Sequence, residues 1–116
     1  MLSNSLKNTE QFQTVYREGK SLANRYLVMY LYENHTDGNR VGISVSKKVE
    51  NSVMRHRITR LIRESYRLIE ERLETGFDIV VVARGKAADF PKGKGYEEIR
   101  EAFLNLAKRH HIYRDS

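Results

Sequence analysis

The amino-acid sequence predicts an α+β protein in which helices cover a single β-sheet as a two-layer α/β sandwich. Three stretches carry apolar residues at helical spacing, and they alternate with short runs rich in branched and aromatic residues. With 116 residues, 40% of them hydrophobic and 31% charged, the chain has the size and composition of a single folded domain. We expect that domain to span residues 1–116.

The first predicted helix has Thr9 as its N-cap and ends at Gly19. Phe12 and Tyr16 lie one helical turn apart in it, so their rings can share one surface. Residues 1–8 and residues 110–116 are mostly polar. We therefore expect both ends of the chain to be flexible.

Two strands are predicted next, over residues 25–32 and 41–46, separated by turn-forming residues that favour a β-hairpin. The second strand has one apolar face and one face of small residues, Gly42, Ser44 and Ser46. Because aromatic residues such as Tyr30 lie on the first strand, two explanations are open. Either something flat lies on this face of the sheet, or a helix packs closely against it.

A long helix is predicted over residues 51–72, with Asn51 or Ser52 as its N-cap. Its apolar residues share one face. The opposite face is a basic stripe of His56, Arg60, Arg63 and Arg67. The arginines begin in the N-terminal half, where the helix dipole disfavours positive charge. A solvated polar face is the simpler explanation, but this density of arginine favours an external polyanion, because a guanidinium can bind two phosphate oxygens.

The remaining elements are a strand and a last helix. The nearly continuous apolar run Phe77–Ala83 predicts a buried, central strand. A loop over residues 84–95 holds the single proline, and an amphipathic helix over residues 96–109 follows. The expected order is therefore helix, two or three strands, long helix, strand and helix.

The charge of the chain is concentrated in one segment. Residues 40–67 hold eight basic and two acidic residues, so the net charge of this segment is +6. The rest of the chain holds thirteen basic and thirteen acidic residues, so this one segment carries the whole net charge of +6. This imbalance favours a polyanionic partner. The chain has no cysteine, no signal-peptide pattern and no apolar run long enough to span a membrane. We therefore expect a cytoplasmic protein without a membrane partner.

No catalytic or metal-binding motif is recognisable in the polypeptide. Of the four histidines, His35 lies in a predicted turn, and His110 and His111 lie in the polar tail without a carboxylate or thiol beside them to complete a metal site. Paired carboxylates, a nucleophile elbow and a phosphate-binding loop are also missing. We therefore predict no catalytic residue and no metal ligand.

Four segments form a recognisable pattern: Phe12-Gln-x-x-Tyr16, Ala23-Asn-Arg25, Val41-Gly-Ile-Ser-Val-Ser-Lys-Lys48 and Asn51-x-Val-x-Arg-x-Arg-Ile-x-Arg-x-x-Arg63. Together they resemble the protein component of bacterial ribonuclease P, and the likeness extends over about residues 6–106. The arginine run is the most specific of the four, and it follows the Ser-Lys-Lys segment at the distance typical of the family.

The resemblance implies a ribosomal-protein-like fold of order α-β-β-β-α-β-α, with an unusual left-handed β-α-β crossover. It also implies a non-catalytic subunit of an endoribonuclease, which binds ribonuclease P RNA and the 5′ leader of precursor tRNA to support 5′-end maturation. The RNA-binding residues it implies are Lys47, Lys48, Arg55, His56, Arg57, Arg60, Arg63 and Arg67. The leader-binding residues it implies are Phe12, Tyr16, Tyr30, Ser44 and Ser46.

The resemblance further implies no cofactor on the protein alone and Mg²⁺ in the ribonucleoprotein. Three residues depart from the usual family pattern: Glu50 replaces glycine, His56 replaces asparagine and Thr59 replaces lysine. They remove a positive charge and an amide from the basic stripe and add a negative charge beside it, so they bear on the strength of RNA binding.

Three other functions compete with this interpretation. The first is an RNA-binding structural protein, such as a ribosome-associated factor, which would use the same basic helix without a leader site. The second is a protein-only nuclease, against which the missing acidic site argues. The third is a membrane-surface helix, which is disfavoured because the apolar face of the long helix is needed to cover the sheet.

Overall fold

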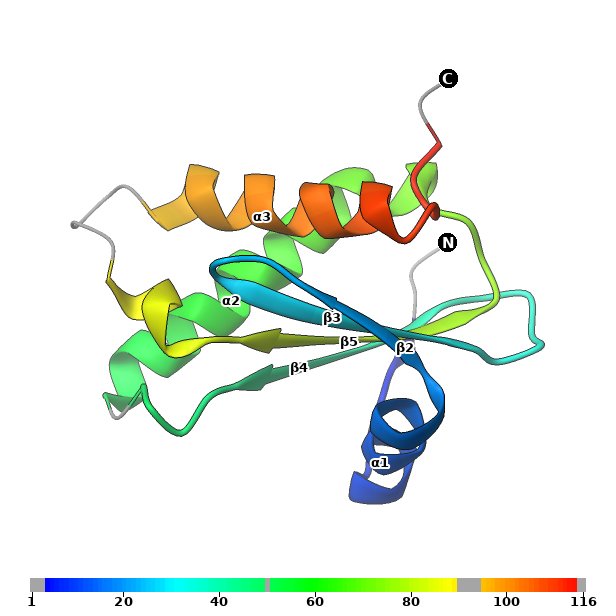
Figure 1. Ribbon diagram of the computed structural model, residues 1–116, viewed down its shortest axis with the longest axis horizontal. Coiled ribbons are helices and arrows are strands. Elements are labelled where there is room, and N and C mark those ends of the chain that lie inside the picture. Colours follow the sequence, from blue (N-terminus) through cyan, green and yellow to red (C-terminus); the bar gives the residue numbers. More distant parts are fainter. Residues whose placement is uncertain (1–3, 50, 90–94, 115–116) are drawn as a thin grey trace.

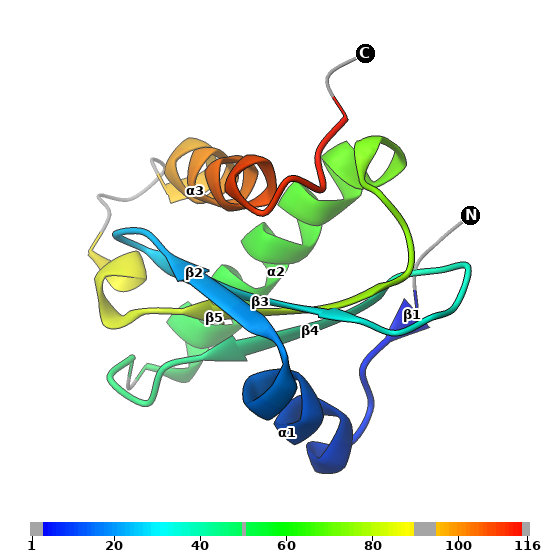
Figure 2. The same cartoon turned by 45° about the vertical axis from the view of Figure 1, so that its right-hand side comes forward.

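The computed structural model describes residues 4–49, 51–89 and 95–114 and confirms the predicted α+β fold. Figure 1 shows one β-sheet with helices α2 and α3 covering one face and helix α1 lying across the other. Because α1 covers only part of its face, the remainder of that face stays open (Figure 2). The helices are α1 (Thr9–Glu18), α2 (Ser52–Ile69) and α3 (Gly95–Arg109).

The sheet has five strands in the order β1-β4-β5-β3-β2. Strand β5 pairs parallel with β4 and antiparallel with β3, and the short strand β1 pairs parallel with β4. The bounds are β1 (Asn4–Ser5), β2 (Lys20–Ala23), β3 (Leu27–Glu33), β4 (Arg40–Val45) and β5 (Phe77–Ala83). Three strands between α1 and α2 agree with the predicted order, and β1 is an addition to it.

The predicted hairpin between the strands now labelled β3 and β4 is wrong. The turn residues between them do form a loop, but β5 lies between the two strands in the sheet. Ile79 and Val81 on one face of β5, and Val80 on the other, are all fully buried. A strand that is apolar on both faces is most stable in the centre, where both backbone edges are paired and both faces are covered. The prediction that β5 is central is therefore confirmed.

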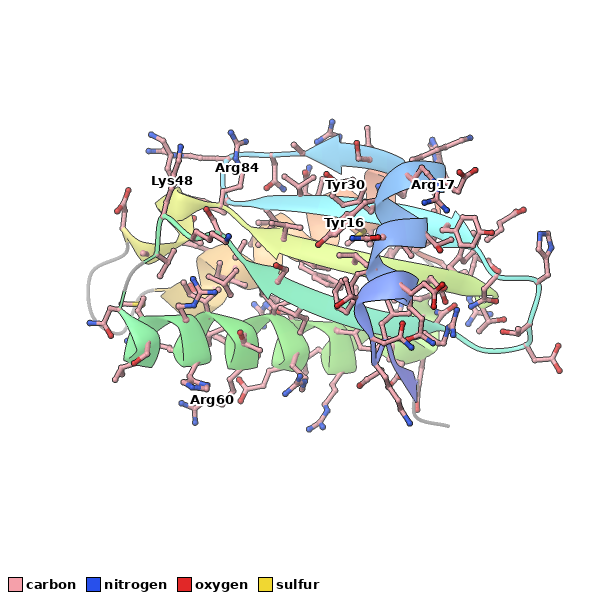
Figure 3. All side chains as sticks on the ribbon, turned by 90° about the horizontal axis from the view of Figure 1, so that it is seen from below. Tyr16, Arg17, Tyr30, Lys48, Arg60 and Arg84 are labelled. Atoms are coloured by element: carbon pink, nitrogen blue, oxygen red, sulfur yellow. The ribbon has the colours of Figure 1, made fainter. Side chains whose placement is uncertain are left out.

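Helix α2 joins the parallel neighbours β4 and β5 by a left-handed crossover. In Figure 3 strands β4 and β5 both point left and β5 lies above β4, and Figure 1 places α2 on the face of the sheet that is turned away in that view, so from the side of α2 the connection turns to the left. Right-handed crossovers are the general rule. The Asn51 side chain caps α2 by accepting from the backbone N–H groups of Val53 and Met54. The predicted long helix ends at Ile69 and tightens into a 3₁₀ turn, η1 (Glu70–Arg72).

Two described residues within the terminal stretches that were expected to be flexible, Leu6 and Ile112, are buried in the fold. Near the N-terminus, Leu6 is buried and its N–H donates to the carbonyl of Val41. Helix α1 is capped by Asn8 rather than Thr9, in a capping box with Gln11. Near the C-terminus, Ile112 is buried, because an apolar residue within a polar stretch can still cover the edge of the core.

A buried ion pair joins the ends of the central strands. Asp78 on β5 is almost fully buried, and it accepts from Arg40 Nε and Nη2 at 2.7 and 2.5 Å. Asn34, in the loop after β3, donates to the same carboxylate at 2.9 Å. This bonding raises the pKa of the Arg40 guanidinium. The network therefore ties β3, β4 and β5 together beside α1.

Candidate nucleic-acid interface

The basic stripe of α2 faces solvent as predicted. His56, Arg60, Arg63 and Arg67 are exposed, while Ile58 and Ile62 on the opposite face are buried against the sheet. Figure 3 shows Arg60 pointing away from the body of the protein. Within the described residues, none of the four basic side chains forms an ion pair with a carboxylate. Their charges therefore remain available to an external anion.

The other predicted RNA-binding residues differ in position. Lys47 and Lys48 are exposed in the loop between β4 and α2, and Arg57 is half-buried. Thr59 is half-buried and its hydroxyl donates to the carbonyl of Arg55 in the preceding turn. Glu50 lies outside the described residues.

Arg55 is not part of the exposed stripe. Its Nη1 donates to the carbonyls of Ser46 and Val49, both at 3.0 Å, and its Nη2 donates to the carbonyl of Val45 at 3.2 Å. Where the chain turns from β4 into α2, these carbonyls have no strand to pair with, and one guanidinium with five N–H donors satisfies all three. Arg55 therefore shapes the loop that carries Lys47 and Lys48, and its expected contact with RNA stays a prediction.

Replacing Arg55 by alanine should lower the melting temperature while leaving the salt dependence of RNA binding unchanged. The reason is that three carbonyls lose a charged donor, whereas no phosphate contact is removed. Arg60→Ala is the matched control, for which we expect the opposite pattern: an unchanged melting temperature and a salt slope smaller by about one unit. A reduced slope in Arg55→Ala would instead place its guanidinium on phosphate.

An aromatic platform lies on the face of the sheet that carries α1. The rings of Tyr16 and Tyr30 meet edge to face with centroids 4.9 Å apart, and the rings of Phe12 and Tyr16 are 6.3 Å apart. Figure 3 shows Tyr16 and Tyr30 side by side over the sheet. Tyr16 is 38% exposed, which is unusual for a large ring and leaves its surface available for stacking.

Of the two predicted serines, Ser44 borders this platform. Ser44 hydrogen-bonds to Tyr16. Burial raises the pKa of Tyr16, and nearby Tyr30 raises that pKa further. The hydrogen bond from Ser44 opposes this shift. Ser46 accepts from the backbone N–H of Lys48 at 3.2 Å, so its side chain shapes the loop before α2.

The small-residue face receives helix α1 at Gly42, which is one of the two explanations that the sequence left open. A Cβ atom on Gly42 would approach Phe12 Cζ to 2.5 Å, so α1 packs on the sheet at this point through Phe12. Phe12 is half-buried and packs against the small core cluster of Leu6, Val15 and Val80. Phe12 is therefore held by the core more firmly than Tyr16, while the sheet beside Ser44 stays open.

Sequence analysis missed Arg84, an exposed residue directly after β5. Its Nη1 donates to the carbonyl of Asn24 at 2.7 Å. Figure 3 shows Arg84 and Lys48 at the same end of the sheet, beyond the tyrosines. A lone arginine after a central strand carried no signal in the sequence, because its neighbours in space come from distant parts of the chain.

The described residues contain no group of three or more histidines, cysteines or carboxylates that could hold a metal ion. His110, expected in a flexible tail, instead places its Nε2 2.9 Å from the carbonyl of Met29. Burial lowers the pKa of His110, while the hydrogen bond to Met29 opposes this shift. In the described part of the chain, no helix is both long and apolar enough to span a membrane.

A basic helix and a separate aromatic platform on one small sheet define the class of this protein, an RNA-binding protein. Comparisons with known proteins lead to the particular family. The family model for Ribonuclease P matches residues 2–110. The ribonuclease P protein component of Lachnoclostridium phytofermentans is 57% identical over 115 residues, which cover 99% of this chain and 96% of the relative.

Solved structures agree with this match. The RNase P protein of Staphylococcus aureus superposes with a TM-score of 0.85 at 33% identity, covering 97% of this chain and 100% of that one. The Thermotoga maritima RNase P protein superposes with a TM-score of 0.82 at 35% identity, covering 91% and 96%. The chain therefore belongs to the family of bacterial ribonuclease P protein components, which are subunits of a ribonucleoprotein endoribonuclease and partner with ribonuclease P RNA.

Proposed function

We propose that this chain holds ribonuclease P RNA through the stripe of α2 and binds the 5′ leader of precursor tRNA over the aromatic platform. The observation that carries the proposal is the exposed Tyr16 ring, which lies against Tyr30 on an open sheet face. Single-stranded RNA is bound by aromatic stacking beside positive charge, because every base has a face that can stack. Lys48 and Arg84 supply that charge at the end of the same sheet.

The chemistry then belongs to the RNA subunit, in a cytoplasmic ribonucleoprotein. No group of acidic or histidine side chains in the described ranges is arranged to hold metal ions. We therefore assign the Mg²⁺ of the ribonucleoprotein mainly to RNA phosphates, with no cofactor on the protein alone. The protein's part is to offset phosphate repulsion between two RNAs with fixed positive charge and to add affinity for the leader.

Replacing Tyr16 or Tyr30 by alanine should weaken binding of leader-bearing tRNA by about 1–3 kcal/mol for each base that loses its stacking partner. The measurement is the ratio of affinities for precursor and mature tRNA with the RNA subunit present. Only the leader differs between these two ligands, so the loss should fall on the precursor. Phe12→Ala should in addition lower the melting temperature, because Phe12 packs against the core.

Tyr113→Ala is the matched control, because Tyr113 pairs with Leu73 and contacts Lys108, away from the platform. Its affinity ratio should equal that of the parent protein. If the Tyr16 and Tyr30 variants lose stability but keep the parent ratio, the rings belong only to the core. Equal affinity of the parent protein for precursor and mature tRNA would favour the alternative, an RNA-binding structural protein without a leader site.

A further inference from the structure

A groove separates the outer edge of β4 from α2. Strand β1 pairs with β4 only at Arg40 and Val41, and no other strand of the described residues continues along that edge. Two hollows of about 240 and 320 Å³ lie between this edge and α2, and Ile43 lines both of them. We call them together the β4–α2 groove.

The backbone of Ile43 faces into this groove. The carbonyls of Val41 and Val45 both point outward, because the first accepts from the N–H of Leu6 and the second from Arg55 Nη2. Alternate residues of a strand direct their backbone groups to the same side, so the N–H and C=O of Ile43, between them, also point outward. The opposite side of β4 pairs with β5. A strand edge of this kind offers one donor and one acceptor to a ligand.

The α2 wall of the groove is positively charged. Arg63 and Arg67 line the first hollow together with Glu70, and His56 lines the second. Arg63, Arg67 and His56 belong to the basic stripe. An occupant must therefore suit guanidinium groups on one side and a backbone donor–acceptor pair on the other. A nucleotide has both properties, since its phosphate binds arginine and its base edge carries adjacent donors and acceptors.

We propose that the β4–α2 groove binds an unpaired nucleotide of the RNA subunit, with its base edge on the N–H and C=O of Ile43 and its phosphates on Arg63 and Arg67. This rests on the proposed function, in which α2 binds that RNA. The nucleotide must be unpaired, because in a duplex the hydrogen-bonding edge is already occupied by the partner base. The groove would thus add recognition of RNA structure to the general attraction of the stripe for phosphate.

Amide hydrogen exchange measured residue by residue tests this proposal. In the complex with the RNA subunit, the Ile43 amide should exchange at least about tenfold more slowly than in the free protein, because it gains an acceptor. Ser21 is the control amide. It lies on the edge strand β2. Asn24, three residues further along, hydrogen-bonds with Leu27 of the neighbouring strand β3. Because backbone groups alternate sides along a strand, those of Ser21 point away from β3 and therefore outward. Its exchange should not change.

A pair of proline substitutions supplies a second, independent measurement. Ile43→Pro and Ser21→Pro each remove one outward N–H from an edge strand, where proline is tolerated. Ile43→Pro should lower the affinity for the RNA subunit about tenfold, and Ser21→Pro should leave it unchanged. If Ile43→Pro binds the RNA subunit with parent affinity, and the Ile43 amide of the parent protein exchanges in the complex at the rate of the free protein, the groove proposal is wrong but the proposed function stands. If the parent protein does not bind the RNA subunit, both fail.

Discussion

Replacing Arg40 by methionine should lower the free energy of unfolding by about 3 kcal/mol, because it leaves the carboxylate of Asp78 buried without its cation. The Asp78 side chain is only 2% exposed, whereas that of Arg40 is 36% exposed. We take the lower end of the range for broken buried pairs, because Asn34 still donates to the carboxylate. At roughly 4 °C per kcal/mol for a domain of this size, the melting temperature should fall by roughly 12 °C.

Removing the charge of Asp78 should be less harmful. In Asp78→Asn the side-chain oxygen can still accept a hydrogen bond, and the partly exposed Arg40 can reach water, so we expect a loss of about 1 kcal/mol. Thermal or urea unfolding of the two variants measures the asymmetry. An equal or smaller loss in Arg40→Met than in Asp78→Asn would contradict the account of this network.

Replacing Arg60 and Arg63 together by alanine should reduce the salt slope of RNA binding by about two units, one for each phosphate contact. A difference of two units means that the affinity advantage of the parent protein shrinks roughly fifteenfold between 50 and 200 mM salt. Both side chains are exposed and make no ion pair within the described residues. The melting temperature should therefore remain that of the parent.

The measurement is RNA affinity at several salt concentrations. Lys108→Ala is the control for the loss of charge alone, because Lys108 is an exposed cation on α3, outside the stripe. Its slope should match that of the parent protein. An unchanged slope in the folded Arg60 and Arg63 double variant would show that these arginines do not bind phosphate.

Periodicity in the sequence was sufficient to predict which face of α2 is basic and that β5 is central. Both features depend on local patterns, namely helical spacing and a continuous apolar run. The partners of β3 and β4 were not predictable in this way, because turn residues specify a reversal of the chain and not which strand fills the space between. The short strand β1 was not predicted either, because its own residues carry no pattern that indicates pairing with β4.

Arg55 shows a different limit of sequence analysis. In the sequence it belongs to the same arginine run as Arg60 and Arg63, and only the geometry separates them. The Arg55 guanidinium donates hydrogen bonds to three backbone carbonyls that precede α2. The side chains of Arg60 and Arg63 face solvent instead. A motif therefore identifies the family, but the role of each of its residues follows from what its side chain contacts.

The central claim is that the protein binds and the RNA cleaves, and a cleavage assay tests it most directly. Purified protein alone should not cut precursor tRNA at the mature 5′ end at any magnesium concentration, and addition of the RNA subunit should restore cutting at that site. The protein should also lower the magnesium concentration that the RNA needs, because it supplies fixed positive charge. Site-specific cleavage by RNA-free protein that is lost in a folded variant of an acidic residue, such as Asp89→Asn, would contradict the claim.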